Sequence, residues 1–407
     1  MERTDVLVVG GGATGVGVAR DLAMRGVDVT LVERGGLNAG TSGHSHGVLH
    51  SGARYADDDP EGARECIEEN RILRDIAGEC VADTGGYFVQ TSDDSAYFET
   101  KRDACRDLDI PVDVIDGDTA RETEPRLADD VERVFRVPDG VVYPSRLVAA
   151  NAADAREHGA TIHVDAPVTD VLVSNGAVVG ASVDHPVGSI EADHVVNATG
   201  AWAGELAAMV DVDIEMTPTK GAMAVVDLPS LRTVLNRCRP ASDGDIVVPH
   251  PDAGTAILGT TSVEVDDPDD FPTSEAEVED VFVECAAMLD TLPREALERV
   301  YWGVRPLYTP ERYGEDARGI SRGFYLLDHA DRDGLGGFST IVGGKLTTYR
   351  RMAEATADHV CERLGVDAAC RTAEEPLVHH DDLDTLDGLV REFDAGGPAD
   401  ADVVGSE

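Results

Sequence analysis

The sequence predicts an α/β fold in which a parallel-sheet domain is interrupted by a mostly antiparallel α+β lobe. Three observations lead to this prediction. A glycine-rich strand–turn–helix pattern opens the chain, short strand-like runs followed by one helical stretch fill residues 216–330, and a strand–helix pattern returns after 331. We therefore expect a discontinuous first domain at 1–75, 141–215 and 331–370, and a lobe at 76–140 and 216–330.

The first unit, "TDVLVVGGGATGVGVARDLAMRGVDVTLVER", has the order strand, helix, strand. Its apolar run is typical of a buried parallel strand, and the helix should end at the glycine after Arg25. Gly10 permits a tight turn, Gly12 lets a pyrophosphate approach the backbone, and Gly15 lets helix and strand pack closely. The second strand ends on Glu33, whose carboxylate can accept bonds from ribose hydroxyls. This pattern predicts a Rossmann-like site for FAD or NAD.

The middle of the chain continues the first domain. Residues 143–160 read as a helix with Ser145 as its N-cap, and Asn175-Gly176 marks a hairpin within 168–183. Residues 194–206 read as a buried strand, a turn and a helix that opens near Trp202. Near the end, "STIV" should be a strand, and residues 347–364 a helix.

The charge of the chain narrows its possible partners. It has 79 acidic and 34 basic residues, a formal net charge of −45, and lysine only at positions 101, 220 and 345. Such a charge repels phosphate backbones, so we expect no nucleic-acid partner. An acidic, lysine-poor chain suits molar salt, where the Debye length is about 3 Å; an ordinary acidic cytosolic protein is the alternative.

The cysteines and the N-terminal segment indicate a cellular location. None of the seven cysteines forms a C-x-x-C pair, so they read as buried thiols in a reducing cytosol. The apolar stretch at 6–19 is broken by glycines and is neither a signal peptide nor a membrane span. We expect a cytoplasmic protein that reaches the membrane, if at all, peripherally through partners.

Residues 40–55, "GTSGHSHGVLHSGARY", form a loop of small polar residues suited to close packing around a cofactor. A mobile glycine loop is the alternative. The histidines at 44, 46 and 50 match no familiar metal spacing, and we expect no metal.

Specific motifs then point to a family. "LHSGARY", "DGVVYPSRL", "VNATGAWA", "GVRPL" and "VGGKLTTYR", spread over residues 1 to about 370, resemble FAD-dependent glycerol-3-phosphate dehydrogenases, and most of all the A subunit of the anaerobic form. These belong to the D-amino-acid-oxidase-like flavoproteins. The resemblance implies FAD, and oxidation of sn-glycerol 3-phosphate to dihydroxyacetone phosphate by hydride transfer from C2 to flavin N5. It also implies that electrons pass to partner subunits or a quinone.

The resemblance also assigns the substrate side of the site. Arg54 and Arg305 match phosphate-contacting arginines, and Tyr55 adds a hydroxyl. Lys345, between Gly343-Gly344 and a helix start, would stabilise charge at the reduced flavin or contact the substrate oxygen. His50 is chosen as the catalytic base, with Lys345 or water as the alternative.

Other residues are expected around the cofactor. They come from the first βα unit, the loop at 40–49, the turn after the strand at 194–197 and the "GGKLTT" segment. The expected cofactor-binding residues are Gly10, Gly12, Thr14, Gly15, Glu33, Arg34, Thr41, Ser42, His46, Gly47, Leu49, Val168, Thr199, Gly200, Trp202, Gly343, Gly344, Leu346 and Thr347.

Two other functions fit the same fold. A 2-hydroxy-acid or amino-acid oxidase or dehydrogenase would recognise a carboxylate with the same arginines, and a flavin electron-transfer subunit would need no substrate. Residues 371–407 read as an acidic, flexible tail in which "HHDDLD" is a solvated run rather than a metal site. The family members that the chain resembles most usually continue into a cysteine-bearing redox domain, so we expect either a trimmed chain or a different electron route.

Overall fold

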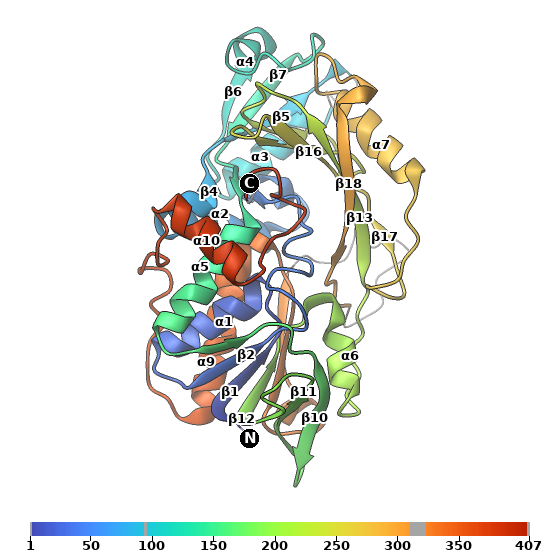
Figure 1. The fold of residues 1–407 in the computed structure, drawn as a ribbon. Coiled ribbons are helices and arrows are strands. Elements are labelled where there is room, and N and C mark those ends of the chain that lie inside the picture. The colour runs from blue at the N-terminus through green and yellow to red at the C-terminus, as the bar shows by residue number, and fades with distance from the viewer. Residues whose placement is uncertain (1, 93–95, 310–322, 405–407) are drawn as a thin grey trace.

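The computed structural model describes residues 2–92, 96–309 and 323–404, so parts of the predicted lobe and tail lie outside the described residues. Two large sheets organise the chain, one in each of two lobes (Figure 1). This arrangement confirms the predicted α/β fold with a mostly antiparallel lobe.

The first sheet has a parallel centre. Strands β20, β12, β1, β2 and β9 lie side by side in that order, while β19, β11 and β10 extend the sheet as antiparallel neighbours. The central strands are apolar and buried because helices or the β10–β11 layer cover both faces. The bounds are β1 Glu2–Val9, β2 Val29–Val32, β9 Thr161–His163, β10 Val168–Ser174, β11 Ala177–Val183, β12 Ser189–Asn197, β19 Phe324–Asp328 and β20 Phe338–Gly343.

Three helices cover one face of this sheet: α1 (Ala13–Met24), α5 (Pro144–Glu157) and α9 (Tyr349–Leu364). On the other face, α6 (Ala203–Ala208) packs in a separate apolar cluster. The predicted helices at 143–160 and 347–364 are thus present. The first turn of the latter is a 3₁₀ helix, Leu346–Thr348, that begins directly after Lys345.

The second sheet is antiparallel except where β14 meets β5. Its order is β17-β13-β16-β15-β14-β5-β7-β6, and β18 also pairs with β13. Helix α7 packs on β13 and β16, and Figure 1 shows this lobe above the first domain. The bounds are β5 Gly86–Gln90, α3 Phe98–Asp107, β6 Asp113–Asp116, α4 Gly117–Thr123, β7 Arg133–Val137, β13 Thr219–Asp227, β14 Val234–Arg237, β15 Ile246–His250, β16 Thr255–Gly259, β17 Val263–Glu264, α7 Glu275–Ala286 and β18 Leu297–Arg305.

Several local predictions can be compared directly. The hairpin at 168–183 is present, and both Asn175 and Gly176 have positive φ, as its turn requires. Tyr143, rather than Ser145, is the N-cap of α5, because Pro144 takes the first helical position. β19 was predicted within the lobe, but it pairs with β20 in the first sheet.

The three lysines are all buried and paired. Lys220 donates to Glu277 at 2.7 Å, and Lys101 donates to Asp57 and, at 2.9 Å, to the carbonyl oxygen of Arg54. Each therefore holds a fixed position inside the protein, and the described surface carries no lysine. The seven cysteines are free thiols, and six of them are buried.

The prediction of a flexible tail is wrong for the described residues 371–404. Helix α10 (Leu383–Glu392) packs on α5 through Leu386, Leu389 and Val390, and Figure 1 shows it on the flank of the first domain. The segment is rich in acidic residues, so the helix and its one apolar face were not predicted from the sequence. Asp382, from the "HHDDLD" run, accepts from Thr385 N and caps this helix.

Asp400, beyond α10, lies fully buried against α5, where it accepts from Ser145 N at 2.9 Å and Ser145 Oγ at 2.6 Å. Burial raises the pKa of Asp400 from about 3.8 to about 6. Because the folded pKa lies above the unfolded pKa, this group's contribution to stability decreases as pH rises from about 4 to 6.

We therefore expect the free energy of unfolding of wild type, relative to that of Asp400→Asn, to fall by roughly 2 kcal/mol between pH 4.5 and pH 7, because only the wild type carries the titrating carboxyl. Denaturant unfolding in molar KCl at the two pH values measures this. A difference that is independent of pH would contradict the expected titration of the buried carboxyl.

Candidate active site

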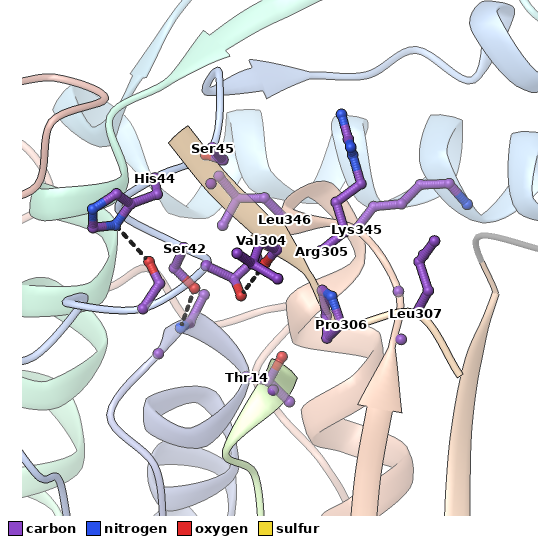
Figure 2. Close-up of a pocket in the computed structure, with 18 of the residues that line it drawn as sticks. Thr14, Ser42, His44, Ser45, Val304, Arg305, Pro306, Leu307, Lys345 and Leu346 are labelled. Carbon is purple, nitrogen blue, oxygen red and sulfur yellow. Dashed lines mark hydrogen bonds between the residues drawn. The ribbon is translucent and has the colours of Figure 1, made fainter. Parts of the chain in front are cut away.

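A cavity of about 560 Å³ runs between the two lobes. Its walls come from the α1 start, the loop at 39–50, the turn after β12, the lobe strands and the segment after β20. In Figure 2, Thr14 and Ser42 lie at one end, and Arg305 and Lys345 lie at the other. The cavity therefore joins a glycine-rich helix start to a cluster of cations.

The glycines at the α1 end are required by close contacts. Gly10 has φ +115°, and a Cβ there would come within 2.5 Å of the carbonyl oxygen of Ala198. A Cβ on Gly15 would come within 1.9 Å of the oxygen of Gly10, so Gly15 sets the packing of helix against strand. The N-cap Gly12 has no side chain to fill the space before α1. The result is a helix N-terminus that opens on the cavity, which suits an anionic pyrophosphate.

Glu33 follows β2 and lines the cavity, as the sequence predicted. Its carboxylate accepts from the backbone N–H of Gly11 at 2.6 Å and of Gly35 at 3.1 Å, which fixes its position beside the glycine turn. Arg34 also lines the cavity, but its guanidinium lies over the Trp202 ring at 4.4 Å and pairs with Asp269 of the lobe at 2.7 Å. Arg34 therefore links the two lobes at this end.

Four residues form a continuous wall at the other end. Lys345 Nζ lies 4.5 Å from the centroid of the Tyr55 ring and 3.7 Å from Asp59 Oδ2. The Tyr55 and His50 rings meet edge to face at 5.3 Å. His50 is fixed by its backbone N–H, which donates to Thr347 Oγ1 at 3.0 Å. An imidazole, a phenol and an ammonium thus share one part of the cavity.

The two arginines predicted to bind phosphate also line the cavity, and Figure 2 shows Arg305 beside Lys345. The Arg305 guanidinium is anchored on the lobe, where it donates to Thr261 O at 3.0 Å and Thr260 Oγ1 at 3.3 Å. Arg54 lies 3.6 Å from the buried carboxylate of Asp245, and Lys101 holds its carbonyl oxygen. Both guanidinium groups are therefore held in place by residues distant in sequence.

Most predicted site residues line the cavity, but three do not. Gly15 acts through its contact with Gly10. Leu49 is fully buried in the core, and Thr347 bonds Val48 and His50 and so supports the wall from behind. The predicted residues that do line it are Gly10, Gly12, Thr14, Glu33, Arg34, Thr41, Ser42, His46, Gly47, His50, Arg54, Tyr55, Val168, Thr199, Gly200, Trp202, Arg305, Gly343, Gly344, Lys345 and Leu346.

Several residues of the cavity wall were not predicted from the sequence. No role was predicted for the acidic run at 56–61, yet Asp58 and Asp59 line the cavity, and Asp59 also caps α2 (Pro60–Ile76) by accepting from Gly62 N. Burial raises the pKa of Asp58. Asp59 directly before Pro60 is a pattern typical of a helix start, and this pattern could have indicated that Asp59 is a helix cap. Ser242 and Asp243, from the loop before β15, also lie in the wall and had no signal.

No group of three His, Cys, Asp or Glu side chains among the described residues could hold a metal ion. Within the same residues, no helix is both long and apolar enough to cross a membrane.

Comparison with known proteins places this site in a family. A model named "FAD dependent oxidoreductase" matches residues 5–350. The chain belongs to the FAD-dependent oxidoreductase family. Within this family it is 53% identical to the A1 subunit of the anaerobic glycerol-3-phosphate dehydrogenase of Haloferax volcanii, over 97% of this chain and 69% of the relative. It is 44% identical to the A subunit of the enzyme of the same name in Escherichia coli strain K12, over 92% and 70% of the two chains.

Solved structures show the same fold. The L-alpha-glycerophosphate oxidase of Mycoplasma pneumoniae, solved with FAD bound, matches with a TM-score of 0.74 at 20% identity, over 91% of this FAD-dependent oxidoreductase and 97% of that chain. The glycerol-3-phosphate dehydrogenase of Bacillus halodurans, complexed with FAD, gives 0.68 at 24% identity, over 91% and 67%. The glycine oxidase of Geobacillus kaustophilus gives 0.71 at 24% identity, over 93% and 100%.

The cavity of this FAD-dependent oxidoreductase fits its cofactor. The open α1 N-terminus suits the pyrophosphate, and the carboxylate of Glu33 suits ribose hydroxyls. Gly343 and Gly344, both with positive φ, have no side chains. A flat ring could therefore approach the backbone beside Lys345. These residues would hold FAD.

Proposed function

We propose that this oxidoreductase converts sn-glycerol 3-phosphate to dihydroxyacetone phosphate. One observation carries the proposal: Arg54, Arg305 and Lys345, from three distant segments, line the same cavity together with His50. A chain of net charge −45 gathers three cations there, which favours a dianionic substrate over a neutral one.

The arginines supply the phosphate recognition. A guanidinium presents a planar fork of donors that suits phosphate oxygens. Thr260 and Thr261 hold the fork of Arg305, and the carboxylate of Asp245 lies 3.6 Å from that of Arg54. Fixed donors lose little freedom on binding, so more of the interaction appears as affinity. Arg54 and Arg305 would therefore set the Michaelis constant for the phosphorylated substrate.

The reacting end lies beside them. His50 is assigned to accept the proton of the C2 hydroxyl, because its ring faces Tyr55 in the same wall. Lys345 stabilises the negative charge that develops as the hydroxyl loses its proton. When bound, FAD supplies the acceptor for the hydride. We assign the onward acceptor to a partner subunit or a membrane quinone, because relatives are named as subunits.

The decisive experiment is a visible spectrum of the purified protein in molar KCl under anaerobic conditions. We expect flavin absorbance that sn-glycerol 3-phosphate bleaches and that glycerol, lactate and D-alanine leave unchanged. Bleaching by a carboxylate substrate alone would replace the proposal with an oxidase of 2-hydroxy or amino acids. A flavin that no substrate bleaches would indicate an electron-transfer subunit.

A variant of Arg54 tests the assignment of this residue to phosphate binding in the same experiment. Arg54→Gln should require about 30- to 100-fold more substrate for half-maximal bleaching, equivalent to about 2–3 kcal/mol of a charged hydrogen bond. Arg71→Gln, an exposed arginine on α2, is the matched control and should behave as wild type.

A further inference from the structure

One wall of the cavity is a loop that we call the cofactor loop, residues 37–46. Seven of its members line the cavity, yet it contains no helix or strand. An irregular segment of this kind loses conformational entropy when it is ordered around a ligand. What holds it in place in the folded protein therefore affects how tightly the cofactor is bound.

The lobe holds the cofactor loop from one side. Thr41 Oγ1 donates to the carbonyl oxygen of Val304 at 2.7 Å, and the Tyr301 hydroxyl donates to the carbonyl oxygen of Ser45 at 2.9 Å. Both lobe residues belong to β18. Figure 2 shows the first of these bonds beside the cavity.

The segment after α10, residues 393–404, holds it from the other side. The N–H of Leu37 donates to Phe393 O at 3.1 Å, and Asn38 Nδ2 donates to Ala395 O at 3.0 Å. Contact is close near Gly397, where an added Cβ would come within 2.8 Å of the Cα of Gly43.

The same segment is tied to the lobe and to the first domain. Asp402 pairs with Arg299 of β18 at 3.0 Å and accepts from Thr255 at 3.1 Å. Asp400 accepts from Ser145 on α5. Loop, β18 and C-terminal segment therefore form a closed set of contacts, in which each of the three touches the other two.

We propose that residues 393–404 are a brace that positions the cofactor loop and thereby controls retention of FAD, with Asp402 as its charged link to the lobe. The carboxylate of Asp402 is partly shielded from solvent, so the pair with Arg299 persists in molar salt. Without the ion pair between Asp402 and Arg299, residues 393–404 and the cofactor loop can adopt more conformations. Only some of these conformations can hold the cofactor.

The test is the rate of FAD release from holoenzyme, followed by flavin fluorescence in molar KCl, together with the melting temperature of the apo-protein. Asp402→Asn keeps the shape of the side chain but removes its charge. We expect FAD release about five- to tenfold faster, with an apo-protein melting temperature close to wild type. The charge-swapped pair Asp402→Arg with Arg299→Asp should restore release to within about twofold of wild type.

Asp381→Asn is the matched control, because Asp381 is exposed in the same C-terminal region before α10. It should release FAD at the wild-type rate. A chain ended after Glu392 should release FAD faster than Asp402→Asn; if that chain fails to fold, the point variant decides. Unchanged release in Asp402→Asn, or a fall in apo-protein melting temperature without faster release, would overturn the proposal and leave the segment a structural element.

Discussion

Lys345→Met is expected to lower kcat/KM for sn-glycerol 3-phosphate by about 10³-fold, because removing a preorganised charge at the reacting atoms typically costs about 3–4 kcal/mol of transition-state stabilisation. The side chain is buried in the cavity wall, 3.7 Å from Asp59 and 4.5 Å from the Tyr55 ring centre. Methionine is similar in length and fits an apolar contact with that ring. Stopped-flow reduction of the bound flavin measures the loss directly.

Lys220→Met is the matched control, since Lys220 is also buried but pairs with Glu277 in the lobe and does not line the cavity. It should lower stability by about 3–5 kcal/mol through the unpaired carboxylate, while the folded protein still reduces its flavin. If Lys345→Met loses stability but keeps its rate of flavin reduction, Lys345 has only a structural role.

His50→Ala is expected to reduce the rate of flavin reduction by about 10²- to 10⁴-fold, as the loss of a general base generally does. The substitution also leaves a space in the wall beside Tyr55, which the imidazole ring occupies in the wild type. Added imidazole can enter that space, so it should restore part of the rate. The measurement is single-turnover flavin reduction with and without imidazole in molar KCl.

Two results would redirect the assignment of the base. A small rate loss with no response to imidazole would mean that His50 only packs in the wall, and Lys345 or water would then be the proton acceptor. Loss of FAD from the variant would show that the residue acts on the cofactor, so flavin content is measured alongside the rate. His158→Ala is the control and should keep the wild-type rate, because His158 is exposed at the C-terminal end of α5 and does not line the cavity.

The sequence by itself determined the first βα unit, the hairpin and most of the cavity wall. Gly10 and Gly15 could be recognised because close backbone contacts admit no other residue, so the spacing carries the geometry. The hairpin at Asn175-Gly176 was equally local, since positive φ at two successive positions restricts the residue types. Lys345 stood out because the composition had removed almost every other lysine.

The tertiary structure alone decided the partners of these residues. Asp58 and Asp59 were not predicted as site residues, because an acidic run does not indicate whether the fold will place it on the surface or in a cavity wall. The C-terminal segment read as flexible for the same reason: its composition is acidic, whereas its order comes from contacts with α5, β18 and the cofactor loop, hundreds of residues away in the chain. Local rules specify backbone conformation, but pairing between distant segments depends on how the two lobes pack, and no short pattern records that packing.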